Sequence, residues 1–110
     1  MNALIIGNVW PEPVSSAAGT RIMQLLESLQ TQGYAVSFAC AAGKTPYAED
    51  LEALDVQTHN IQLNNASFDV FIKELNPDLV LFDKFVIEEQ FGWRVKEQRQ
   101  GALRVLETID

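Results

Sequence analysis

The sequence holds few of the residues that mark secreted, metal-binding or nucleic-acid-binding proteins. Its single cysteine, Cys40, cannot form an internal disulfide, and its single histidine, His59, has no companion ligands at metal-site spacing. Eight Lys and Arg against fifteen Asp and Glu give a net charge of −7, which disfavours nucleic acid and anionic membranes as partners. No apolar run reaches the ~20 residues of a membrane span, and the first residues form no signal peptide. We therefore expect a cytoplasmic protein without a transmembrane segment, a metal or a nucleic-acid partner.

The residues that are present suit one globular domain with its own core. Of 110 residues, 47% are hydrophobic and 9% are aromatic, which supplies enough apolar surface to offset the entropy of the chain. No linker or internal repeat interrupts the sequence, so residues 1–110 are predicted to form a single domain.

Short apolar runs alternate with segments of helical periodicity along the whole chain. Residues 79–82 are apolar throughout, as in a strand buried on both faces, whereas the apolar residues of 68–75 recur at helical spacing. The predicted strands are residues 2–7, 35–40, 56–63, 79–82 and 103–106, and the predicted helices are 18–32, 47–54, 68–75 and 86–98. This alternation predicts an α/β fold, a doubly wound, Rossmann-like parallel sheet of about five strands with helices on both faces.

The loop after the first predicted strand is the leading candidate for a binding site. Ligands of open α/β sheets bind beyond the carboxyl ends of the strands, near the point where the strand order reverses, and the first strand usually lies there. The connection that begins at Asn8 is longer than the ~2–6 residues typical of such loops. A packed surface loop stiffened by prolines is the alternative interpretation. The predicted substrate-binding residues are Trp10, Ser15, Ser16, Gly19, Thr20 and Arg21.

The sequence supports weaker predictions about cofactors and about other polar residues. The loop lacks the three glycines of a dinucleotide fingerprint and the G-x-x-x-x-G-K-[ST] pattern of a phosphate-binding loop, so we expect no dinucleotide or ATP cofactor. Asp83 follows the fourth predicted strand and fits a general base or, with more weight, the N-cap of the next helix. Ser67 is the expected N-cap of the helix before it. No catalytic residue is assigned.

Six short sequence segments, spread over most of the chain, share a resemblance to one family when they are taken together. They are residues 4–13 (LIIGNVWPEP), 18–29 (AGTRIMQLLESL), 33–38 (GYAVSF), 76–81 (NPDLVL), 91–94 (FGWR) and 102–110 (ALRVLETID). Together they resemble nucleotide-sugar glycosyltransferases of the GT-B fold, in a bacterial subgroup. In that family the first strand leads through a proline-containing loop to a glycine pair and a basic residue, where this sequence has Ala18, Gly19 and Arg21.

The resemblance implies that two domains form the active site together and bind different substrates. GT-B enzymes place the active site between two Rossmann-like domains, and the second domain mainly holds the nucleotide-sugar donor. This chain resembles the first, acceptor-side domain or part of it, so the resemblance implies that it lacks the C-terminal donor-binding domain and is inactive alone. In the intact enzyme, Gly19, Thr20 and Arg21 would face the donor phosphates, and the other predicted site residues would touch the acceptor.

A second hypothesis stays open, namely a free-standing binding or interaction module similar in topology to flavodoxin-like receiver domains. Receivers need a cluster of acidic residues after the first strand, where this sequence has Gly7, Asn8 and one nearby acid, Glu12.

The last predicted strand carries an expectation about association. If no helix covers this strand, its edge is exposed, and the chain is then able to form a homodimer through it.

Overall fold

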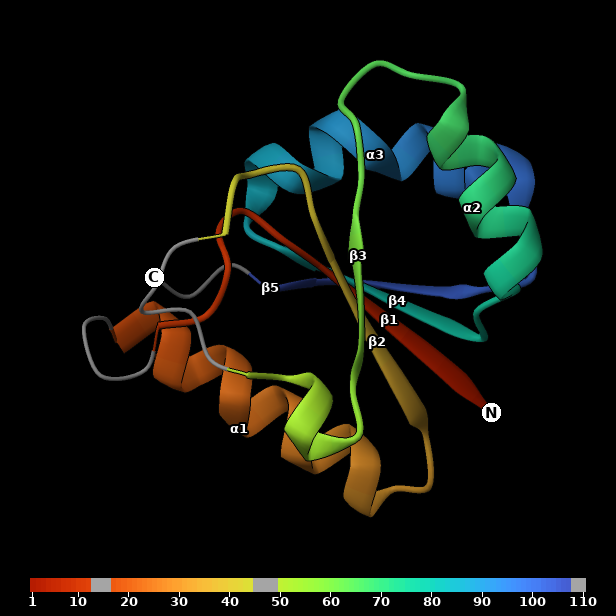
Figure 1. Cartoon of the computed structure of the whole chain (residues 1–110). Coiled ribbons are helices and arrows are strands. Elements are labelled where there is room, and N and C mark those ends of the chain that lie inside the picture. The colour runs from red at the N-terminus through yellow and green to blue at the C-terminus, as the bar shows by residue number, and fades with distance from the viewer. Residues whose placement is uncertain (13–16, 45–49, 108–110) are drawn as a thin grey trace.

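The computed structural model describes residues 1–12, 17–44 and 50–107 of the chain (Figure 1). Five strands form one parallel sheet in the order β3-β2-β1-β4-β5. The strands are β1 (Asn2–Gly7), β2 (Ala35–Cys40), β3 (Gln57–Asn60), β4 (Leu79–Asp83) and β5 (Leu103–Glu107). The helices are α1 (Ala17–Thr31), α2 (Ser67–Leu75) and α3 (Phe85–Gln98), with a 3-10 turn, η1, at Glu52–Leu54. The predicted α/β fold with a five-stranded parallel sheet is therefore confirmed.

Two core clusters lie against the sheet, and successive strand residues contribute to them in turn. In β1, Ala3 and Ile5 join the first cluster and Leu4 and Ile6 join the second, because neighbouring residues of a strand point to opposite faces. The helices divide in the same way, since α1 contributes to the first cluster and α2 and α3 contribute to the second. Figure 1 accordingly shows α1 on one side of the sheet and α2 and α3 on the other.

The most apolar strands occupy the centre of the sheet. Every residue of β4 is buried, as is every residue of β1 after Asn2, which fits strands that are covered on both faces. β3, with the sequence QTHN, is polar and lies at one edge.

Three local predictions are wrong. The predicted helix over residues 47–54 is reduced to η1 within the described residues, because Asp55 adopts a left-handed φ of 67° and ends the turn; residues 47–49 lie outside the described part. Ser67 is the first residue of α2 rather than its N-cap, and its N–H donates instead to the Asn65 side chain at 2.8 Å. Asp83 is the last residue of β4, because its backbone pairs with Glu107 of β5, and the N-cap of α3 is Lys84.

Candidate functional site

The strand order reverses between β1 and β4. The chain runs from β1 through β2 to β3 at one edge of the sheet, and then crosses back to β4 on the other side of β1. The helices that follow β1 and β4 lie with different core clusters, and in open α/β sheets this arrangement leaves a crevice beyond the carboxyl ends of the two strands. The expectation that the first strand lies at the reversal is confirmed.

Polar and small residues end the strands along this carboxyl edge. The sheet register sets Gly7 beside Cys40 and Asp83 beside Glu107, while Ile6 pairs with Phe82 one position earlier. Gly7 and Asp83 therefore end neighbouring strands at the same level. Gly7 must be small, because a Cβ at this position would clash with the ring of Phe38.

Arg21 links the first turns of α1 to the end of β5. Its Nη2 donates to Oε2 of Glu107 at 3.1 Å, with side chains that are 42% and 11% exposed. Its Nε is buried and has no hydrogen-bond partner within the described part of the chain. The ion pair thus holds a partly exposed guanidinium at the carboxyl edge, where an anion can reach its exposed part.

Lys84 adopts a strained backbone beside the crevice. Its φ of 78° and ψ of 160° lie in a region that essentially only glycine occupies at low cost. Its N–H donates to the carbonyl of Glu107 at 2.8 Å, which helps to hold the conformation at the end of β4. Strain of about 1–3 kcal/mol at such a residue is typical of functional sites.

Trp10 joins the loop after β1 to the loop after β2. Its side chain is 4% exposed, and its Nε1 donates to the carbonyl of Ala42 at 2.8 Å. Its ring lies 5.4 Å from the ring of Phe38, and Nζ of Lys44 lies 5.1 Å from its centroid. Trp10 therefore positions both loops beside the crevice, and its contact with an acceptor stays a prediction.

Of the remaining predicted site residues, the structure describes Gly19 and Thr20. Ser15 and Ser16 lie outside the described residues. Gly19 and Thr20 belong to the first turn of α1, where Thr20 is exposed. Of the six predicted residues, the structure places Arg21 at the carboxyl edge through its ion pair with Glu107, and Trp10 in the core beneath this edge.

Sequence reasoning missed Glu107 as the partner of Arg21 and Lys84 as a strained residue. The partners of the ion pair are 86 positions apart, and no local pattern relates them. The signal that was available is that all parallel strands end at one edge, so an acid at the end of β5 faces the same crevice as the start of α1.

The cysteine and the histidine show no sign of catalytic activation. Burial raises the pKa of Cys40, the charge of Asp83 raises it further, and a backbone hydrogen bond at Ala42 acts in the opposite direction. Burial lowers the pKa of His59, whose ring packs 4.7 Å from that of Phe71. Both side chains therefore favour their neutral forms, and the Cys40 thiol is a poor nucleophile.

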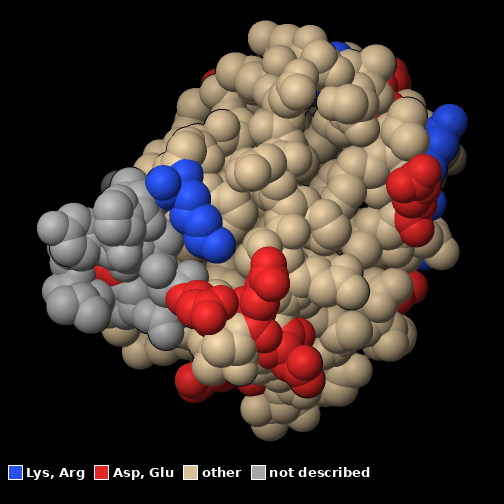
Figure 2. All heavy atoms as spheres, viewed as in Figure 1, with Lys and Arg blue, Asp and Glu red and all other residues tan. Residues whose placement is uncertain are grey.

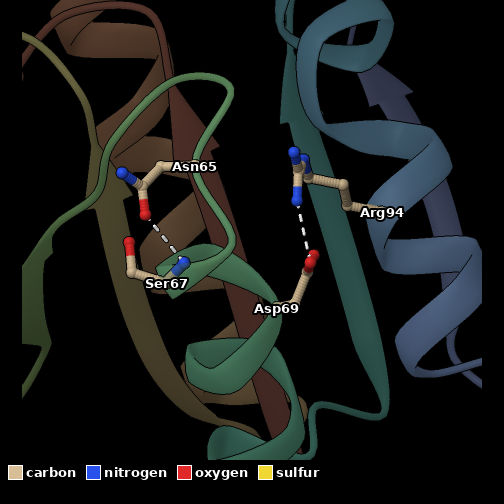
Figure 3. A network of polar contacts seen from close by, with 4 residues as sticks. All are labelled: Asn65, Ser67, Asp69 and Arg94. Carbon is tan, nitrogen blue, oxygen red and sulfur yellow. Dashed lines mark hydrogen bonds and ion pairs between the residues drawn. The ribbon is translucent and has the colours of Figure 1, made fainter.

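A second polar network holds the two helices of one cluster together (Figure 3). Nη1 of Arg94 on α3 donates to Oδ2 of Asp69 on α2 at 2.8 Å, and both side chains are largely buried. The Arg94 guanidinium also lies 4.5 Å from the ring centroid of Trp93. This network orients α3, and with it the flank of α3 that faces β5.

Comparisons with family models, curated proteins and solved structures found no match for this chain. Within residues 1–12, 17–44 and 50–107, no group of three His, Cys, Asp or Glu residues is placed to hold a metal ion. In the same part of the chain, no helix combines the length and the apolar character that a membrane crossing requires.

Proposed function

We propose that this chain is the N-terminal, acceptor-side domain, or part of it, of a nucleotide-sugar glycosyltransferase of the GT-B class. In this role it works in the cytoplasm with a donor-binding domain and has no transferase activity alone. The observation that carries the proposal is the reversal of strand order between β1 and β4, at the point where the long loop leaves β1. This reversal is where open α/β sheets bind ligands, and the sequence resemblance assigns the substrates to the same loop.

The groups around the crevice suit a phosphate-bearing ligand. The first N–H groups of α1 have no partners within the helix, and such groups bind anions without help from net charge. Arg21 adds a guanidinium with a buried Nε that has no hydrogen-bond partner in the described chain. Because the whole chain carries −7, this attraction is local and favours a small anion over a polyanion.

The order of the strands argues against the receiver-like alternative. Flavodoxin-like folds have the strand order 2-1-3-4-5, whereas this sheet has the order β3-β2-β1-β4-β5 of a Rossmann half. The acids that a receiver needs after its first strand are also missing, since β1 is followed by Asn8 and Val9.

Titration with uridine diphosphate, followed by amide chemical shifts, tests the anion site. We expect the largest shifts at residues 17–21 and 83–84, and we expect Arg21→Gln to weaken binding about tenfold or more, because a charge-assisted hydrogen bond is lost. Arg99→Gln is the matched control, since Arg99 pairs with Asp78 at 3.6 Å near the amino end of β4. Equal affinities of the unmodified chain and of Arg21→Gln would contradict the assignment.

A further inference from the structure

The outer edge of β5 shows apolar side chains and pairs with no other described strand. β5 is the last strand of the sheet, and no other strand of the described residues pairs with its outer side. Leu103 is 59% exposed and Leu106 is 37% exposed, so both faces of the strand show apolar surface. The opposite edge strand, β3, is polar, and Figure 2 shows acidic side chains gathered where η1 and β3 lie. Polar and charged side chains on an edge strand hinder its pairing with another chain, and the exposed leucines of β5 give no such protection.

A groove of about 400 Å³ runs between β5 and the flank of α3. Arg104 pairs with Val80 and Leu106 pairs with Phe82, so these two residues of β5 share the face of the sheet that α3 covers. From α3 the groove is lined by Glu88, Gly92, Trp93 and Lys96. Trp93 is 49% exposed, which leaves a large aromatic surface beside the unpaired strand.

The charges of the groove are separated along its length. α3 runs back from the carboxyl end of β4 to the amino end of β5, so Glu88 lies near the carboxyl edge and Lys96 near the amino edge. Arg104, the second residue of β5, also lies near the amino edge. The groove therefore has an acid at one end, where Leu106 also lies, two bases at the other end, and Trp93 between them.

We propose that this surface binds a second copy of the chain, with the two β5 strands antiparallel about a two-fold axis through Val105. Such an axis, normal to the sheet, keeps each face and reverses the strand direction. In each copy, the acidic end of the groove then faces the basic end of the other copy's groove. This arrangement places Glu88 near Lys96 and Arg104 of the second copy. Arg104 comes opposite Leu106, and backbone hydrogen bonds join the two sheets into one continuous sheet.

The charge pattern argues for a second copy rather than for an unrelated acidic or basic partner. A patch of one sign repels its own copy, whereas a patch that carries opposite charges at its two ends complements itself after a two-fold rotation. The inference rests on the α3–β5 face alone, so it stands or falls independently of the anion site at the start of α1.

Sedimentation velocity over a range of protein concentrations tests the dimer. We expect a species of twice 12.3 kDa, and a dimer dissociation constant that rises about tenfold or more in Glu88→Lys and in Arg104→Glu. The first change turns four attractions across the axis into repulsions, and the second turns two. The double variant Glu88→Lys/Arg104→Glu restores opposite charges between positions 88 and 104 across the axis and should recover part of the affinity, because position 88 still faces Lys96 with a like charge. Lys96→Glu is an independent second variant at the basic end.

Glu97→Lys is the matched control, because it makes the same charge change at an exposed residue of α3 outside the groove. Circular dichroism melts check that each variant is folded. A chain that stays at 12.3 kDa up to its solubility limit would overturn the proposal. A dimer that Gln57→Lys on the β3 edge disrupts, and that Glu88→Lys leaves intact, would also overturn it, since another face would then form the contact.

Discussion

At the scale of single residues, the carboxyl edge of the sheet is organised by contacts rather than by exposed reactive groups. Trp10, which was predicted to touch the acceptor, is packed in the core and joins two loops through its hydrogen bond to Ala42. Arg21 does reach the edge, but its guanidinium already forms an ion pair with the carboxylate of Glu107. An anion that binds here therefore competes with a carboxylate of the protein, which disfavours weakly charged ligands.

Lys84 stores strain that a substitution can release. We expect Lys84→Gly to raise the free energy of unfolding by about 1 kcal/mol. Glycine adopts this backbone conformation without steric cost, and its greater entropy in the unfolded chain offsets only part of this gain. Lys84→Ala is the control, since it removes the same side chain but keeps a Cβ in the strained conformation. Urea denaturation of the three proteins measures the difference. A Lys84→Gly protein no more stable than Lys84→Ala would show that the backbone is unstrained.

At the scale of elements, the ends of the helices were harder to predict than the elements themselves. The apolar pattern of residues 68–75 located α2, but the side-chain oxygen of Asn65, rather than the Ser67 hydroxyl, accepts an N–H at the start of the helix, that of Ser67. Both side chains suit a cap, so the choice depended on backbone geometry that propensity does not contain. The end of α1 at Gly33 was predictable, because a left-handed residue after a helix is usually glycine.

Gly33 closes α1 with a paired set of hydrogen bonds. Gly33 N–H donates to Gln30 and Tyr34 N–H donates to Leu29, with Gly33 at a φ of 96°. We expect Gly33→Ala to lower the free energy of unfolding by about 1 kcal/mol, although no atom lies within 4 Å of the new methyl group. Gly43→Ala is the matched control, because it has the same free space without a positive φ, and it should be neutral or slightly stabilising. Equal thermal melts of the two variants would contradict this role.

At the scale of the whole molecule, the alternation of elements was sufficient to predict the parallel α/β sheet, because parallel strands need crossover helices. It was not sufficient to predict the contact between Arg21 and Glu107, which depends on the order of strands and the placement of α1. Strand order itself was the information missing from the sequence, and it separates a Rossmann half from a flavodoxin-like module. In β5, Leu103 and Leu106 are exposed, and among the described strands β5 pairs with β4 alone.

The most direct test of the account is sugar transfer, assayed with residues 1–110 alone and with the product of the complete reading frame that encodes them. We predict turnover of a nucleotide-sugar by the longer protein and none by residues 1–110, because the proposed anion site beside β1 and β4 comes with no assigned catalytic group. In the longer protein, Arg21→Gln should reduce turnover while Arg99→Gln should not. Robust transfer by residues 1–110 alone would contradict the proposal that this chain is one half of a two-domain glycosyltransferase.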